Sequence, residues 1–293
     1  MKINEIRPQD SKYLQGLESI ALKPKLLYYY GNWPKNRVKT VAIVGARKNT
    51  RYGEEVAYKL AKALGERGII VVSGLAYGID SIAAQGCLDG GGKTIAILGT
   101  EIERIYPTSH IALAEKIIEN GGVVASEYHI GDDLGDHRTS FLYRNRIISA
   151  LSDVVVVVEA REKSGSLNTA AHALEQGKDL FAVPGDINRQ TSQGCNRLIM
   201  SGANPYLGVE DFIKYLLPNT RTRSKQAKKA QISLFADNEE ERAILNLLSE
   251  DIRDGDIIME KLQMNVATFN QTITMLEIKG VIRSLGANCW TLN

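Results

Sequence analysis

Basic residues follow one predicted strand at a point where phosphate could bind. After the run TVAIV the chain continues GARKNTRYG, which places Arg47, Lys48 and Arg51 beside the start of a predicted helix. Guanidinium and ammonium groups bind phosphate oxygens, and so do backbone N–H groups at a helix amino terminus. We predict an anion site here, against the alternative of a structural turn with solvated charges. Only Gly45 and Gly53 match a dinucleotide fingerprint, so an NAD site is not favoured.

Two further turns combine small and polar residues. VVSGLAYGID brings Ser73, Gly74 and Gly78 to a strand end, where a sugar-phosphate backbone can approach without meeting a Cβ. Asp80 is expected to cap the following helix, with orientation of Arg47 as the alternative. Lys163-Ser164-Gly165-Ser166 also follows a strand and opens a helix with hydroxyl groups. Both turns are predicted to contact phosphate.

The segment FLYRNR interleaves aromatic and basic side chains. Phe141 and Tyr143 supply rings on which bases can stack, and Arg144, Asn145 and Arg146 supply hydrogen-bond donors for phosphate. In the alternative interpretation the rings belong to the core and the arginines pair with acids. The pattern favours a site for single-stranded nucleic acid.

The elements that must position these residues alternate between short apolar runs and helical patterns. The predicted strands are TVAIVG, GIIVVSG, KTIAILG, GVVASE, DVVVVVEA and DLFAVPG. Such alternation is typical of βαβ units and a parallel sheet. Ligands of such sheets bind outside the carboxyl ends of the strands. The predicted fold class is therefore α/β, with an extended Rossmann-like parallel sheet domain.

Four segments are expected along the 293 residues. Residues 1–38 form a packed lead-in, 39–217 the Rossmann-like domain, 218–236 a basic flexible linker and 237–293 a small domain. Three helical patterns and a two-stranded hairpin in the last segment predict a winged helix. Its presumed recognition helix has only Lys279 as a cation and its hairpin adds Arg283, so protein interaction is favoured over duplex reading.

Composition sets limits on function. The net charge of +2 requires any basic surface to be local, and three separated cysteines fit neither a disulfide framework nor a zinc knuckle. The first residues lack an apolar signal region, so we expect a cytoplasmic protein without membrane contact. His129, Asp132, Asp133, Asp136 and His137 are interpreted as a polar loop, with a divalent metal site as the alternative. No metal and no cofactor are expected.

Several of these segments together are similar, in order and spacing, to one family. They are VGARKNTRYG, VVSGLAYGID, TIAILG followed by IYP, SE at 126–127, FLYRNRIISALS, VVVVVEAREKSGSLNTA, LFAVPGDIN and QGCNRLIMSGA. Over residues 6–213 the chain resembles the DNA-processing protein A (DprA/Smf) family. The resemblance implies a single-stranded-DNA-binding protein, often a homodimer, that protects incoming DNA and helps to load a RecA-type recombinase in natural transformation and recombination.

The resemblance also implies the binding residues. The family's basic pocket corresponds here to Arg47, Arg144, Arg146, Lys163 and Lys178, and the close polar or backbone contacts correspond to Gly45, Gly74, Ser164, Gly165, Ser166 and Asn196. The chain departs from the family pattern at several positions, among them Ala84 and Gln85, which stand where the family commonly has a histidine. Ala46 stands where a hydroxyl residue is usual, and Glu101 and Glu103 stand in a run that is usually rich in glycine. Two carboxylates near the site would repel phosphate.

Other functions stay open at this point. QISLF in the linker resembles the pentapeptide with which DNA-metabolism proteins bind the bacterial sliding clamp, which assigns Gln231, Leu234 and Phe235 to that contact. Packing of the Leu-Phe pair on the winged helix is the alternative. An adaptor role through the winged helix and QISLF is a second function. A phosphoribohydrolase-type enzyme is a third, although no catalytic glutamate follows Pro184-Gly185. We expect a DNA-binding protein and not an enzyme.

Overall fold

The computed structural model describes residues 2–132, 137–218, 237–249, 252–286 and 288–292. It contains two compact units, Met1–Ile213 and Lys214–Asn293, whose mutual placement is not defined. The boundary between the units lies within helix α7 (Val209–Leu216), near the predicted end of the first domain. Nearly all of the predicted linker, together with the QISLF peptide and Gln231, Leu234 and Phe235, lies outside the described residues.

The first unit is built on one sheet of nine strands in the order β1-β2-β6-β5-β4-β3-β7-β8-β9. Its seven parallel strands are β3 (Thr40–Val44), β4 (Ile70–Ser73), β5 (Thr94–Leu98), β6 (Val123–Ser126), β7 (Val154–Val157), β8 (Asp179–Ala182) and the short β9 (Asn204–Pro205). The six predicted strands are all present. Their central residues are buried on both faces, which is why they form continuous aliphatic runs.

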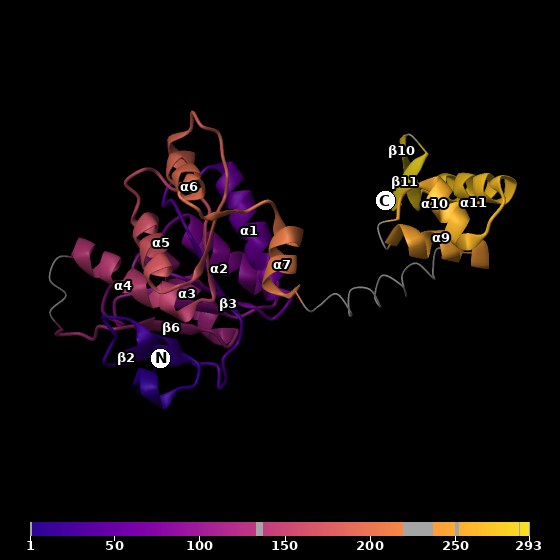
Figure 1. The fold of residues 1–293 in the computed structure, drawn as a ribbon. Coiled ribbons are helices and arrows are strands. Elements are labelled where there is room, and N and C mark those ends of the chain that lie inside the picture. The colour runs from indigo at the N-terminus through magenta and orange to yellow at the C-terminus, as the bar shows by residue number, and fades with distance from the viewer. Residues whose placement is uncertain (1, 133–136, 219–236, 250–251, 287, 293) are drawn as a thin grey trace. The chain divides into compact units, whose positions relative to one another are not determined.

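The helices divide between the two faces of the sheet. α1 (Arg51–Gly65), α2 (Ile79–Asp89) and α3 (Ile111–Glu119) connect β3 to β6 in successive steps in one direction across the sheet. α4 (His137–Leu151) returns across the sheet to β7, and α5 (Gly165–Glu175) continues to β8 in the opposite direction. Because such crossovers are right-handed, the reversal places α4 and α5 on the other face (Figure 1).

Alternate residues of each strand supply the two layers of the core. Ile95 and Ile97 of β5 pack in the cluster that contains α4, whereas Ala96 and Leu98 pack in the cluster that contains α2 and α3. α6 (Gln190–Met200) follows β8, and Phe212 of α7 packs edge-on against Phe181. Period-two alternation therefore sorts one strand's side chains between two helical layers.

The amino-terminal residues extend the sheet, which the sequence did not predict. β1 (Asn4–Ile6) pairs with β2 (Leu27–Gly31), and β2 pairs with β6, both antiparallel. The short 3-10 helices Pro8–Asp10 and Leu14–Ser19 lie between them. The predicted lead-in is thus an integral edge of the first unit (Figure 1).

The second unit has the predicted order of three helices and a hairpin. These are α9 (Glu239–Ser249), α10 (Gly255–Leu262), α11 (Val266–Ile278), β10 (Ile282–Gly286) and β11 (Cys289–Leu292). Its own core includes Ile244, Ile258, Phe269 and Leu276. Among the helices of the described residues, none has both the length and the apolar character that a membrane span needs.

Candidate nucleic-acid interface

Five exposed basic residues lie in the loops that follow three neighbouring strands. Arg47 and Lys48 follow β3, Arg161 and Lys163 follow β7, and Arg189 follows β8. These strands are adjacent in the sheet, so their carboxyl-end loops form one edge, which we call the basic crest. Within the described parts of the chain none of the five has an ion-pair partner. Arg161 and Arg189 were not among the predicted site residues, although their position at strand ends was a usable signal.

Arg47 is the crest residue with a defined pocket. Its guanidinium lies 5.5 Å from the centre of the Phe141 ring, and a small pocket beside it is also lined by Gly74, Tyr77 and Tyr106. An arginine stacked on an aromatic ring keeps its outer donors free for phosphate, and exposed rings offer a surface for a base. The arrangement suits a phosphate with an adjoining nucleobase.

The start of α1 is not the open anion site that the sequence predicted. The carboxylate of Glu159, buried at the end of β7, accepts hydrogen bonds from the backbone N–H of Thr50 at 2.8 Å and from its hydroxyl at 2.6 Å. The Thr50 hydroxyl in turn accepts from the Gly53 N–H at 3.2 Å. An internal carboxylate therefore occupies this helix terminus. The exposed cationic groups that remain at this turn are the Arg47 and Lys48 side chains.

Gly53 and Gly45 are required by this packing. A Cβ on Gly53 would lie 2.5 Å from the Glu159 carboxylate, and one on Gly45 would lie 2.7 Å from Ile79. The need for glycine at position 45 is therefore explained by the close contact between the end of β3 and α2. Whether it also approaches DNA stays a prediction.

Arg144 faces the interior and not the solvent. Its guanidinium donates to the carbonyl of Gly74 at 3.0 Å, to the carbonyl of Ile97, and to the Asn145 side chain at 3.1 Å. Only 5% of the residue is exposed, and burial lowers its pKa to about 10, an effect that the charge of Asp80 opposes. Arg144 thus holds together the carboxyl ends of β4 and β5 beneath the Arg47 pocket.

Asp80 supports the same turn instead of capping α2. Its carboxylate accepts from the Gly74 N–H at 2.8 Å, whereas the N-cap of α2 is Gly78 without a side-chain hydrogen bond. Burial raises the pKa of Asp80, and the nearby Arg144 and Arg47 charges lower it. The expected capping role is therefore wrong, because the side chain turns back to the 74–76 backbone.

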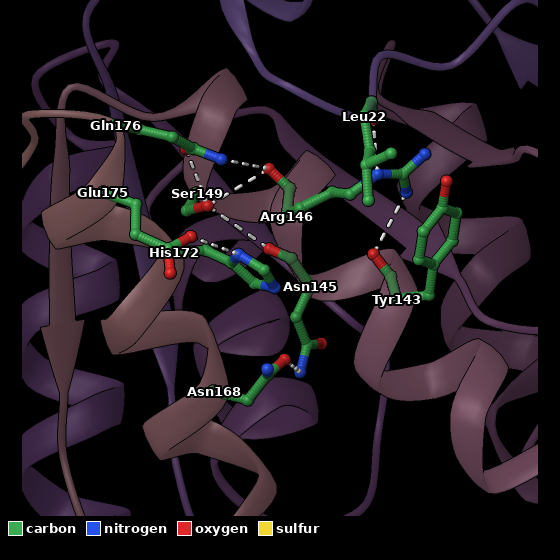
Figure 2. Close-up of polar contacts among 9 residues, drawn as sticks. All are labelled: Leu22, Tyr143, Asn145, Arg146, Ser149, Asn168, His172, Glu175 and Gln176. Carbon is green, nitrogen blue, oxygen red and sulfur yellow. Dashed lines mark hydrogen bonds and ion pairs between the residues drawn. The ribbon is translucent and has the colours of Figure 1, made fainter.

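Arg146 is also internal. Its guanidinium donates to the Leu22 carbonyl at 2.6 Å and to the Tyr143 carbonyl at 3.0 Å (Figure 2). It also donates to both carboxylate oxygens of Glu127 at 2.8 Å. The Tyr143 ring lies 3.7 Å below it. Arg146 therefore fastens α4 to the amino-terminal segment, and Glu127 is an ion-pair partner rather than a free base.

Asn145 and its neighbours connect α4 to α5. The Asn145 amide donates to the Asn168 side chain at 3.2 Å, and the Ser149 hydroxyl donates to the Gln176 side chain at 2.8 Å (Figure 2). The Asn145 amide also donates to the Gly165 carbonyl at 3.3 Å. The three consecutive polar residues of FLYRNR are thus buried on a helix that packs under the strand ends. The sequence predicted that these three residues bind DNA, whereas in the structure their side chains bond within the protein.

The other predicted residues fall at both ends of the sheet. The Ser164 hydroxyl caps α5 and bonds to Ser166 at 2.8 Å, next to the exposed Gly165, so this turn lies at the basic crest with Lys163. Asn196 of α6 binds both the N–H and the carbonyl of Gly185, which orders the loop after β8. Lys178 precedes β8 and therefore lies at the opposite edge, where burial and the charge of Arg37 lower its pKa. The structure does not bring it to the crest.

The two carboxylates that depart from the family pattern are not equivalent. Glu103 accepts a hydrogen bond from the backbone N–H of Ile130 at 3.1 Å and lies 2.9 Å from Nε2 of His129, so each of its carboxylate oxygens has a partner. Among the described residues, the ion-pair partner of Glu101 is Arg104, at 3.7 Å, and the second carboxylate oxygen of Glu101 is buried without a hydrogen-bond partner there. Of the predicted polar loop, Asp133 and Asp136 and the side chain of His137 lie outside the described residues. The described part of the chain contains no cluster of three metal-ligating side chains.

In the winged helix, the cation of the presumed recognition helix is neutralised. Lys279 contacts Glu241 at 2.6 Å and Asp237 at 2.8 Å. These pairs leave little charge for a phosphate contact at that end of α11.

The amino-acid sequence matches two family models and is similar to known proteins. Residues 4–217 match the family model described as DNA recombination-mediator protein A, and residues 228–288 match that of the DprA winged helix domain. Protein Smf of Synechocystis is 39% identical over 215 residues, which are 72% of this chain and 53% of that protein. The chain therefore spans about half the length of this relative.

Two solved structures are similar in fold and sequence. DNA processing protein A of Streptococcus pneumoniae is 36% identical with a TM-score of 0.65, covering 73% of this chain and 74% of that one. DNA processing protein A of Helicobacter pylori, whose single-stranded-DNA-binding mode has been studied structurally, is 32% identical with a TM-score of 0.64, covering 75% and 97%.

Proposed function

The chain belongs to the DNA-processing protein A (DprA/Smf) family, and from this premise we propose that it is a non-enzymatic, cytoplasmic protein that binds single-stranded DNA along the basic crest. The observation that carries the proposal is the row of exposed, unpaired cations after β3, β7 and β8. Arg47, stacked on Phe141, would bind one phosphate, and Lys163 beside the Ser164–Ser166 turn would bind another. A strand held through its phosphates is bound with little dependence on sequence.

Two predicted residues take supporting roles in this proposal. Arg144 and Arg146 would act by ordering the Gly74 turn and α4, because their donors are occupied within the protein. Lys178 is not included, since it lies at the other edge of the sheet. Gly45, Gly74, Gly165 and Asn196 shape the loops against which the strand would lie.

The proposal is tested by the salt dependence of binding. A fluorescent oligothymidylate strand is titrated with protein at several salt concentrations, and log K is plotted against log salt. Five crest cations predict a slope of about −3.5, and Arg47→Ala or Lys163→Ala should each reduce its magnitude by about 0.7. Lys178→Ala is the matched control and should leave the slope unchanged. The proposed site would be contradicted if the binding constant did not depend on salt concentration, or if all three substitutions changed the slope equally.

We also propose that the bound strand is passed to a RecA-type recombinase and that the protein acts as a homodimer, as its family membership suggests. The winged helix would bind a protein, since Lys279 is paired with acids while Val266 and Ile278 of α11 are exposed. Clamp binding by QISLF stays a prediction from the sequence. Strand exchange by recombinase on DNA covered with a single-strand-binding protein measures the loading role, which an absence of stimulation would exclude.

A further inference from the structure

Tyr52 places an aromatic ring within the basic crest. It lies in the first turn of α1, which follows β3, and its hydroxyl donates at 3.0 Å to the carbonyl of Pro184, in the loop after β8. β7 lies between β3 and β8 in the sheet. The Tyr52 side chain therefore passes over the end of β7, where the Glu159 carboxylate binds Thr50 of the same turn.

The ring of Tyr52 is exposed although its hydroxyl is bonded. The residue is 42% exposed, and partial burial raises its pKa, so the phenol is neutral and donates a hydrogen bond at neutral pH. The bond to Pro184 holds the ring in one place and commits the hydroxyl proton. A ring fixed in this way loses little conformational freedom when a ligand stacks on it.

The loops on both sides of Tyr52 contain the cations of the basic crest. Arg47 and Lys48 precede it after β3, Arg161 and Lys163 follow β7, and Arg189 follows Pro184 after β8. Single strands are held by this combination, in which cations bind the backbone phosphates and aromatic rings stack on the bases. The position of Tyr52 thus suits a base whose neighbouring phosphates lie on the crest.

Tyr52 is distant from the aromatic wall of the Arg47 pocket. A Cβ on Gly99 would lie 2.5 Å from the Phe141 ring, so that ring lies against the end of β5. In the order β5-β4-β3-β7 three strand spacings separate the ends of β5 and β7, roughly 14 Å in total. Stacked bases rise by about 3.4 Å, so the two rings belong to different nucleotides of one strand.

We propose that Tyr52 is a stacking platform for a base of bound single-stranded DNA, at a position along the strand separate from the Arg47 pocket. The inference rests on the proposed binding of single-stranded DNA at the basic crest. The contact is made by the face of the ring, because the hydroxyl proton is committed to Pro184. Every base has a π face, so the platform accepts any base, and the larger rings of purines stack more strongly.

Two strands of equal length test the platform, oligothymidylate and a strand of abasic residues that keeps the phosphates and lacks the bases. In fluorescence anisotropy Tyr52→Leu should bind oligothymidylate about tenfold more weakly than wild type, which is in the range for the loss of one stacked base. Its affinity for the abasic strand and its salt slope should be unchanged, because no phosphate contact is lost. Tyr52→Phe keeps the ring and should bind both strands within about twofold of wild type.

Tyr58→Leu is the matched control. It removes a tyrosine of the same helix whose hydroxyl bonds to Asp89 at 2.8 Å, away from the strand ends, and it should bind both strands as wild type does. Circular dichroism establishes that each variant is folded.

A strand with 5-iodouracil at successive positions tests the contact directly. Irradiation links this base covalently to an aromatic ring stacked on it, and mass spectrometry of the digested complex identifies the linked peptide. In the wild-type protein one position of the strand should link to Tyr52. The measurement does not depend on the folding of any variant, and Tyr52→Leu should lose this link while a link at Phe141 persists.

The outcomes separate stacking from a positioning role and from failure of the crest proposal. If Tyr52→Leu weakens binding of both strands equally and lowers the magnitude of the salt slope, Tyr52 instead positions the loop that carries Arg189, and stacking is excluded. Wild-type affinity of Tyr52→Leu for oligothymidylate, or cross-links that never include Tyr52, also overturns the platform and leaves the crest proposal intact. If the wild-type protein binds neither strand, the crest proposal fails as well.

Discussion

Replacing Arg144 by alanine distinguishes an internal arginine from one that contacts DNA. The substitution removes the donors to the carbonyls of Gly74 and Ile97 and to Asn145, and it leaves the buried carboxylate of Asp80 without its main opposing charge. The cost should therefore appear in the free energy of unfolding.

The magnitude follows from the groups left without partners. An unsatisfied buried acceptor costs about 1–3 kcal/mol, and an uncompensated buried charge is of the same order or larger. We expect Arg144→Ala to lower the free energy of unfolding by about 3–5 kcal/mol. For a unit of this size such a change corresponds to a fall in Tm of about 6–20 °C. Urea unfolding followed by circular dichroism, with a parallel thermal scan, measures both.

Arg47→Ala is the matched control, because it removes an arginine at the same edge that makes no hydrogen bond to the described residues. It should change the free energy of unfolding by less than about 0.5 kcal/mol and reduce the salt slope of DNA binding. Folded Arg144→Ala protein should keep the wild-type slope. The reasoning is refuted if Arg144→Ala is as stable as wild type and its slope falls as much as that of Arg47→Ala.

Four further substitutions have defined outcomes. Gly99→Ala should cost about 1–3 kcal/mol and weaken DNA binding, because the new methyl displaces Phe141, whereas Gly165→Ala should be tolerated with its Cβ 3.8 Å from the nearest atom. Chemical denaturation and fluorescence anisotropy would show whether the two variants differ in stability and in DNA binding. Thr50→Ala removes the cap of α1 and should lower the free energy of unfolding, measured in urea, by about 1 kcal/mol. An unchanged free energy would mean that the cap does not stabilise the protein. Arg146→Ala should expose the amino-terminal segment to limited proteolysis, and an unchanged digestion pattern would argue against its fastening role.

The sequence was sufficient for the fold class and for the edge that carries the site. Runs such as VVVVV identified the central strands because a strand buried on both faces must be aliphatic, and their carboxyl ends located Arg47 and Lys163. The antiparallel strands β1 and β2 were missed. Their sequences are short and half-exposed, so their strand character depends on the edge of β6 that they cover.

The direction in which charged side chains point was decided only by the tertiary structure. In FLYRNR the sequence contains two arginines at a suitable place, and nothing local distinguishes one that binds phosphate from one that binds strand-end carbonyls. Packing of α4 beneath β4 and β5 turned Arg144 inward. In the same way Glu159, in the segment that follows β7, closes the amino terminus of α1. The sequence by itself determined which residues can bind an anion. The tertiary structure determined which of them are free to do so, because burial commits each donor to the nearest unsatisfied acceptor.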